Sequence, residues 1–249
     1  MWPAVWSEVR WAFTPPRSWL LGVVANVVLA LVWLSVQPLA SGGRHHQDWV
    51  ILVGTYFSSF VLADTTTTNV LGADHDRVQR ALAESIPPWR MLLRKNLALL
   101  VLVGLPVLAV AAVLTLWLET PARLGVTIPN VAVPILSWLG IGNVVSVLLP
   151  VAEVPLAQRW GQRHDRRRIV LWLSSLALPY ALYFVADPIG GVEHRELWRA
   201  LPTAVAHIVG PVLGRDTKSA VHLGVAIMVW MAGTLFADWW VRRRGVQFR

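Results

Sequence analysis

Six long apolar stretches constrain the fold of this chain more than any other feature of its sequence. A helix needs about 20 mostly apolar residues to cross roughly 30 Å of hydrocarbon. The segments that qualify are Trp19–Ala40, Trp49–Asn69, Asn96–Leu118, Val131–Ala152, Ile169–Ala186 and Ala220–Val241. Only 14% of the 249 residues are charged, against about 25% in a soluble domain. The sequence therefore predicts an all-α polytopic membrane protein whose six-helix transmembrane domain covers residues 18–249.

The basic residues between these stretches predict the orientation in the membrane. If the amino terminus is cytoplasmic, 16 of the 22 Lys and Arg residues fall on the cytoplasmic side, as the positive-inside rule requires. Both termini are then cytoplasmic. This clustering at helix ends accounts for the net charge of +8 and argues against nucleic acid as a partner. The 15 tryptophans and the excess of Arg over Lys favour a GC-rich bacterium, so we expect a multi-pass protein of the bacterial plasma (inner) membrane.

Residues 1–17, before the first span, have the pattern of an amphipathic helix. Trp2 and Trp6 belong to a set of apolar residues that recur at helical spacing, and Glu8 and Arg10 lie between apolar positions. Two consecutive prolines then stop the helix. Helices of this kind lie in the membrane interface with the apolar face toward the lipid. We expect an interfacial connecting helix here; the alternative is a frayed tail.

The loop between the second and third spans, residues 73–95, carries the most regularly patterned charges. Asp74 or Asp76 is suited to cap a short helix, because a carboxylate there accepts hydrogen bonds from unpaired backbone amides. That helix has apolar residues on one side and charged residues on the other, and we expect it to end at Pro87-Pro88. It suits either docking on a soluble partner or a solvated connection, and periodicity alone favours neither.

The stretch Asn69–Asn96 resembles the second cytoplasmic segment of exporter-type ABC transporter permeases. The run Ser85-Ile-Pro-Pro-Trp-Arg-Met-Leu-Leu-Arg-Lys-Asn96 is similar to the motif that leads into their third span. The run Gly142-Asn-Val-Val-Ser-Val-Leu-Leu-Pro150 is similar to a motif of bacterial members, and the plan of a connecting helix and six spans is similar too. The chain departs from the family at Pro87-Pro88-Trp89, where the family often has a smaller polar residue. Its outer loop before span six is also too short for a large extracellular domain.

The resemblance implies the permease subunit of a type-2 ATP-binding-cassette exporter, which moves an amphiphilic or hydrophobic cargo (drug, lipid or glycolipid) out of the cytoplasm or inner leaflet. The sequence has no Gly-x-x-x-x-Gly-Lys-Ser/Thr phosphate loop, the motif that cradles nucleotide phosphates. We therefore expect no enzymatic activity and no cofactor on this chain, with ATP and Mg in a separate ATP-binding subunit. A second permease subunit, identical or different, would complete the path. The residues expected to contact the ATP-binding subunit are Asp74, Arg77, Arg80, Glu84 and Pro87, joined by Glu8 and Arg10 of the connecting helix.

Polar residues within the predicted spans are candidates for a translocation path or a dimer seam. An ionisable group at the bilayer centre costs at least ~2.5–3.5 kcal/mol on insertion scales, which makes each one notable. The candidates are Asp64, Thr67, Asn69, Asn143 and Ser146. A wetted helix end is the favoured interpretation for Asp64, and hydrogen bonding between helices is favoured for Asn143 and Ser146. We expect no metal site, because no histidine pair in the outer loops has metal-ligand spacing.

The outer segment 187–217 is expected either to re-enter the outer leaflet as a lid or to rest on the surface as an amphipathic helix. Two further functions compete with transport: a six-span lipid-modifying membrane enzyme and a non-catalytic membrane scaffold. Such an enzyme needs His, Asp or Glu clustered at one interface, whereas the predicted inner loops offer mostly arginine.

Overall fold

The structure is a computed structural model that describes residues 1–14, 22–32, 49–62, 65–151, 165–186 and 215–246. All regular secondary structure in these residues is helical, which agrees with the predicted all-α class. Asp64 lies outside the described residues, as does the predicted outer segment except for its last three residues.

Three helices are long and apolar enough to cross a membrane, and they indicate a membrane protein. They cover Pro88–Leu118, Pro121–Leu148 and Ser219–Arg244, where the third, fourth and sixth spans are predicted. At the other three predicted spans the described apolar helices are shorter. These are Gly22–Val32, α3 (Trp49–Leu62) and the apolar part, Ile169–Tyr183, of α10 (Arg166–Ala186).

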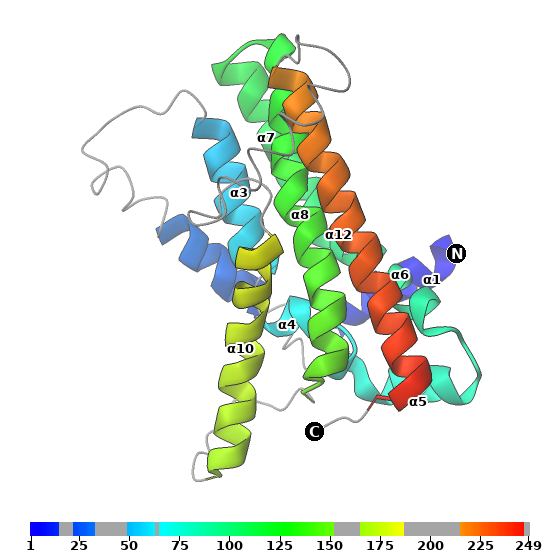
Figure 1. Cartoon of the computed structure of the whole chain (residues 1–249). Coiled ribbons are helices and arrows are strands. Elements are labelled where there is room, and N and C mark those ends of the chain that lie inside the picture. Colours follow the sequence, from blue (N-terminus) through cyan, green and yellow to red (C-terminus); the bar gives the residue numbers. More distant parts are fainter. Residues whose placement is uncertain (15–21, 33–48, 63–64, 152–164, 187–214, 247–249) are drawn as a thin grey trace.

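The helices of the bundle alternate in direction along the chain (Figure 1). α8 (Leu124–Leu148) and α12 (Arg215–Arg244) run downward in this view, whereas α7 (Leu105–Leu118) and α10 run upward. The first residues of α10 and the last residues of α12 are triple arginines, and both lie at the lower end of the bundle with α5 (His75–Ala83). Basic residues from three separate loops thus gather at one end, as expected for a cytoplasmic face.

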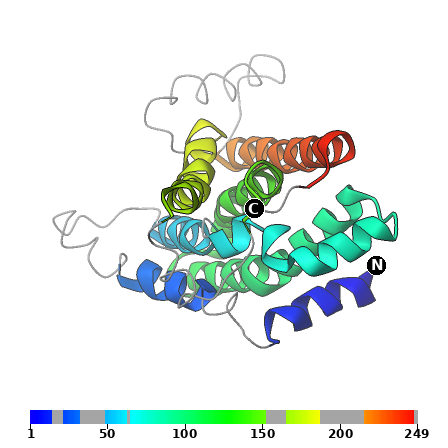
Figure 2. The same ribbon diagram turned by 90° about the horizontal axis from the view of Figure 1, so that it is seen from below.

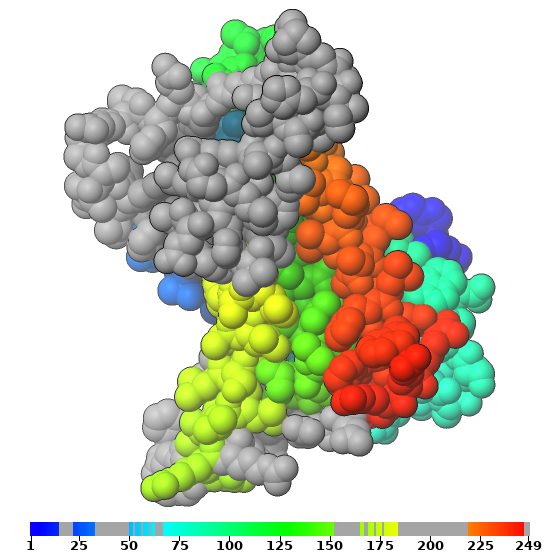
Figure 3. Space-filling view, viewed as in Figure 1, coloured from blue at the N-terminus to red at the C-terminus, as the bar shows by residue number. Residues whose placement is uncertain are grey.

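The tightest helix pair is formed by α8 and α12, which run in parallel, and α8 shows only as a strip between α10 and α12 on the face in Figure 3. A Cβ added at Gly140 of α8 would lie 2.6 Å from the carbonyl oxygen of Val229, and one added at Gly233 of α12 would meet the carbonyl group of Gly140. Close by, Asn143 Nδ2 donates a hydrogen bond to Thr234 Oγ1 (2.9 Å). Small residues and hydrogen bonds of this kind hold helices together in membranes, where burial of apolar surface drives association little.

The third predicted span is one helix with an irregular turn. α6 (Pro88–Leu99) continues through a π-helical turn, η2 (Leu100–Gly104), into α7. Pro106 lies two residues after the turn, and a proline ring clashes with the carbonyl four residues earlier in a regular helix. A π-bulge relieves that clash locally. The fourth predicted span, in contrast, stays helical through Pro129 and Pro134.

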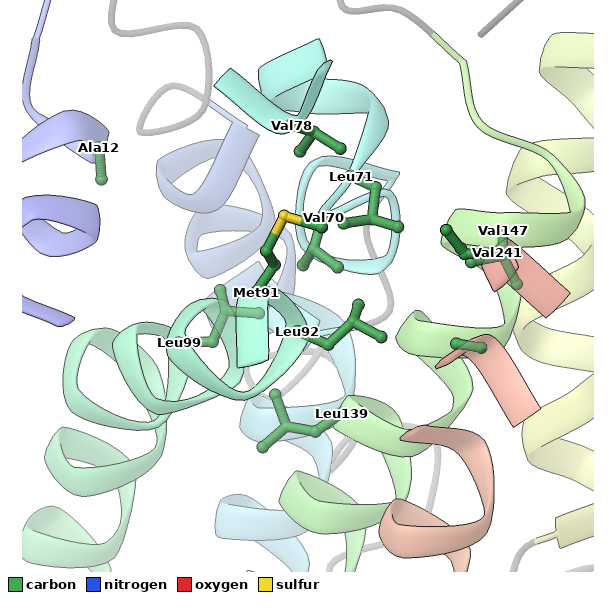
Figure 4. Close-up of a cluster of buried hydrophobic side chains, with 11 residues drawn as sticks. Ala12, Val70, Leu71, Val78, Met91, Leu92, Leu99, Leu139, Val147 and Val241 are labelled. Atoms are coloured by element: carbon green, nitrogen blue, oxygen red, sulfur yellow. The ribbon is translucent and has the colours of Figure 1, made fainter. Parts of the chain in front are cut away.

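α1 (Trp2–Ala12) confirms the predicted amphipathic helix and lies lengthwise beside α6 at the edge of the bundle (Figure 2). Val5 and Val9 are buried against Ala98 of α6. Ala12 joins an apolar cluster that also draws residues from the loop after α4 (Thr65–Thr68), from α5 and α6, and from α8 and α12 (Figure 4). The core at the basic end therefore depends on segments from most of the chain.

The contact between α8 and α12 predicts a strong effect of a single methyl group at Gly233. Gly233→Ala should lower the free energy of unfolding by about 1–3 kcal/mol, because overpacking forces the two backbones apart. Gly224→Ala on the same helix is the matched control, since a Cβ there meets nothing within 4 Å, and it should unfold at the wild-type temperature or slightly above. Thermal unfolding of the purified chain in detergent measures both, and equal loss in the two variants would contradict the packing.

The orientation can be measured with cysteines, because the chain has none of its own. Ala83 in α5 and Ala122 in η3 (Pro121–Arg123) are both exposed alanines in short helices, on either side of the Pro88–Leu118 helix. A membrane-impermeant maleimide should label Ala122→Cys in intact cells and Ala83→Cys only after permeabilisation. Labelling of both variants in intact cells would rule out the predicted topology.

Candidate functional site

The interactions at the two ends of α5 differ from those that the sequence predicts. Asp74 stands at the amino-terminal cap position, but its side chain makes no capping hydrogen bond. At the other end, Ser85 takes a positive φ of 60°, and the amides of Ser85 and Ile86 donate to the carbonyls of Leu82 and Ala81. This is a Schellman ending.

The expectation that Pro87-Pro88 ends this helix is therefore wrong in detail. α5 ends at Ala83, before the prolines, and Pro88 is the first residue of α6 with Pro87 as its cap. Proline favours the first turn of a helix because its missing N–H is one that would lack a partner there anyway.

Four charged side chains from α1, η1 (Gly72–Asp74), α5 and α6 form one closed network, which we call the junction network. Arg77 contacts both carboxylates, Glu8 Oε1 at 2.8 Å and Asp74 Oδ2 at 3.0 Å. Lys95 Nζ does the same, with Asp74 Oδ2 at 3.0 Å and Glu8 Oε2 at 3.3 Å. Two acids and two bases thus alternate around a ring, and the ring has no net charge.

The junction network is largely shielded from solvent. The side chains of Asp74 and Lys95 are 6% and 9% exposed, and that of Glu8 is 13% exposed. Trp11 of α1 lies against both cations, with its ring centroid 5.4 Å from Lys95 Nζ and 6.0 Å from the Arg77 guanidinium carbon. The side chain of Arg77 is 32% exposed. Buried charges such as those of Asp74 and Lys95 are tolerated only when each has a partner, so these two side chains depend on the network.

The structure divides the residues predicted to contact an ATP-binding subunit into two sets. Asp74, Arg77 and Glu8 face inward and form the junction network. Arg80 and Glu84 are exposed on α5, and Arg10 is exposed on α1. The second set is the more accessible to a partner, and of the first set Arg77 also remains 32% exposed.

The sequence did not identify Lys95 and Trp11 as members of the site. Lys95 belongs to the basic run that precedes the third span, where its charge is unremarkable. A usable signal exists in its position: Lys95 is followed by a long apolar run, and a lysine at such a place needs a carboxylate partner if it is buried. Trp11 was one of 15 tryptophans and carried no signal of its own.

The predicted path or seam residues that the structure describes are engaged in packing within the chain. Thr67 Oγ1 donates to the carbonyls of Val61 and Leu62 at the end of α3, and Ser146 Oγ reaches the Thr68 carbonyl on α4 at 2.8 Å. Asn143 bonds Thr234, as already described. These contacts confirm the hydrogen-bonding interpretation of Asn143 and Ser146.

Asn69 clamps the end of α8. Its side-chain amide donates to the backbone carbonyl of Val151 and accepts from the Val151 amide at 3.3 Å. Gly72 lies against this clamp so closely that a Cβ there would meet both Asn69 and the Val151 carbonyl. Asn69 thus fixes the chain just before residues 73–95, which we call the coupling segment, to the basic end of α8.

Asp238 provides a second anchor for the segment. Asp238 forms an ion pair with Arg242, one turn later on α12, at 2.8 Å. In addition, Asp238 Oδ1 accepts a hydrogen bond at 3.1 Å from the amide of Trp89. That amide lies in the first turn of α6, where helices leave backbone donors without partners, so Asp238 of α12 supplies a cap from another helix.

No family model matches the chain. Comparisons with curated proteins and with solved structures also give no significant match. The resemblance to ABC permeases therefore rests on the two sequence runs and on the predicted plan of a connecting helix and six spans. Among the described residues, no three His, Asp or Glu side chains are placed to hold a metal ion.

The cavity beside the junction network is too small for a cargo. It measures about 30 Å³ and is bordered by Glu8, Trp11, Lys95 and apolar side chains, which leaves room for about one water molecule. The arrangement suits mechanical linkage, since it ties α5 to the interfacial helix and to the start of a membrane-crossing helix.

The junction network predicts strongly non-additive stability effects. Lys95→Met should cost about 3–5 kcal/mol, because it leaves two buried carboxylates with one cation. Adding Asp74→Asn should recover part of that loss, since the Glu8–Arg77 pair then remains balanced. Arg242→Gln, which removes a half-exposed pair at the same end, is the control and should cost at most about 1 kcal/mol. Denaturant or thermal unfolding of the single and double variants completes a double-mutant cycle. Additive losses in the free energy of unfolding would show that the network is not coupled.

Proposed function

We propose that this chain is the transmembrane subunit of an ATP-driven exporter of the ABC class, working in the plasma membrane of a bacterium. Two such subunits, identical or different, would enclose the path of an amphiphilic or hydrophobic cargo. Both termini and α5 would face the cytoplasm, and separate ATP-binding subunits would supply ATP hydrolysis. The support comes from the sequence runs at Ser85–Asn96 and Gly142–Pro150 and from the construction of the coupling segment.

The proposal rests on the contacts that attach α5 to the rest of the protein. One face is fixed to the protein through Val78, which is 2% exposed, and through Arg77 in the junction network. Beside these anchors, the exposed residues Asp76, Arg80 and Glu84 are presented at the basic end of the bundle. A solvated connecting helix has no need for such an anchorage, whereas a helix that receives force from a partner does.

The side chains of the junction network would transmit such a force. A displacement of α5 acts on Lys95 through Asp74, and Lys95 lies in the helix that continues to Leu118. The same displacement acts on Glu8, and hence on α1, through Arg77. Movement of a docked ATP-binding subunit would reach the membrane helices by these two connections.

The docking surface is tested by exchanging exposed charges on α5. The double variant Arg80→Glu plus Glu84→Lys keeps the net charge and alters only exposed side chains. It should retain the melting temperature of the wild type but lose the ATP-binding subunit, because charge complementarity fixes such interfaces and like charges brought together are repelled. The readout is photolabelling by 8-azido-ATP, and vanadate-sensitive ATP hydrolysis, in the complex purified through a tag on this chain.

The matched control makes the same two exchanges elsewhere. Asp165→Lys plus Arg166→Glu alters an exposed acid and an exposed base at the start of α10, at the same end of the bundle, and should leave nucleotide labelling intact. Loss of labelling in both double variants would point to a general charge effect. Turnover of a lipid by the purified chain alone, without nucleotide, would instead favour the lipid-modifying enzyme.

A further inference from the structure

α1 presents three different faces around its circumference. Val5, Val9 and Ala12 are buried against the protein. The next face is aromatic and exposed: Trp2 is 65% exposed and Trp6 55%. At about 100° per residue, the face that follows carries Pro3, Ser7, Arg10 and Thr14, all of them exposed.

This third face borders a groove between α1 and α5. The groove has a volume of about 470 Å³, and its walls include Trp6, Ser7, Arg10, Trp11, Thr14 and Arg77. Such a volume is within the range of small-molecule sites. Two tryptophans, two hydroxyls and two guanidinium groups make the groove chemically distinct from the apolar surface of the bundle.

The charge of the groove favours an anion. Arg77 is neutralised by Glu8 and Asp74 on its inner side. Arg10 forms no ion pair within the described part of the chain. The groove therefore has one positive charge without a counterion, and the planar guanidinium of Arg10 is well suited to hold a phosphate.

The two hydroxyls restrict the ligand further. Ser7 Oγ donates to the carbonyl of Ala4 and Thr14 Oγ1 donates to the carbonyl of Trp11, each at 2.7 Å. With their protons used, both oxygens offer only lone pairs to a ligand. A matching ligand has an anionic phosphate for Arg10 and hydroxyl donors for Ser7 and Thr14.

The neighbouring aromatic face indicates where such a ligand comes from. Trp2 and Trp6 are placed next to Arg10 around the helix, and α1 lies beside α6 at the basic part of the bundle (Figure 2). Exposed tryptophans with an adjacent arginine are typical of a helix at the level of lipid headgroups. A lipid there can place its acyl chains along the aromatic face and its headgroup in the groove.

We propose that the groove between α1 and α5 binds the headgroup of an anionic phospholipid that carries hydroxyl groups. The phosphate lies against Arg10 and the outer edge of Arg77, and the headgroup hydroxyls donate to Ser7 and Thr14. An ammonium headgroup fits less well, because it would meet two guanidinium groups. This site does not depend on the proposed ATP-driven partner.

The test measures which lipid the full chain retains. The purified chain is incubated with vesicles of equal parts phosphatidylglycerol, phosphatidylethanolamine and phosphatidylcholine, and the retained lipids are counted by native mass spectrometry. The wild type should retain phosphatidylglycerol preferentially. Arg10→Gln should reduce that preference about fivefold, the effect of one arginine at an anionic surface. Ser7→Leu, which fills the groove and keeps its charge, should reduce it as well.

Arg80→Gln is the matched control, because Arg80 is an exposed arginine on α5 that does not line the groove. It should keep the wild-type preference for phosphatidylglycerol. Only variants that keep the wild-type melting temperature are compared. An equal loss in Arg10→Gln and Arg80→Gln, or equal retention of all three lipids by the wild type, would overturn the proposal. Displacement of the lipid by inorganic phosphate would also overturn it, in favour of a site for a free anion.

Discussion

Four charged side chains that form one closed network, with Asp74 and Lys95 buried, determine how the basic end of this protein is built. Neither Asp74 nor Lys95 can be buried alone, because an uncompensated charge in a dry environment costs several kcal/mol. Their partners come from α1 and α5, so the interfacial helix, the coupling segment and the third predicted span have to assemble as a unit. An apolar cluster that includes Ala12, Val78 and Met91 joins the same three elements.

The rest of the bundle is held in a different way. Between α8 and α12 the backbones approach at Gly140 and Gly233, and polar side chains bond across the seam. Lipid solvates leucine as well as a protein interior does, so close packing and hydrogen bonds take over from hydrophobic burial. In the proposed exporter, the helices of the bundle and the ionic junction at its basic end would transmit a displacement of α5 to the membrane helices.

The sequence predicted what is local and missed what is distant. Apolar length and helical period are properties of neighbouring residues, and they identified the three long helices and α1. The junction network joins residues 69 and 87 positions apart, which no periodic pattern encodes. The predicted cap at Asp74 failed because Lys95 and Arg77 bind the same carboxylate more strongly than an amide does. The turn at Ser85 lacks the glycine that usually signals a Schellman ending, so the end of α5 was placed too late.

α1 links the junction network on its inner side to the exposed aromatic surface on its outer side. Glu8 and Trp11 hold its inner side to Lys95 and Arg77, and Trp2 and Trp6 remain exposed on its outer side. A headgroup bound at Arg10 would touch the same arginine, Arg77, that closes the junction network. By linkage, any ligand that favours one position of α1 also favours the position of α5 that goes with it. The composition of the inner leaflet and the docking of a partner on α5 would then act on a single mechanical element.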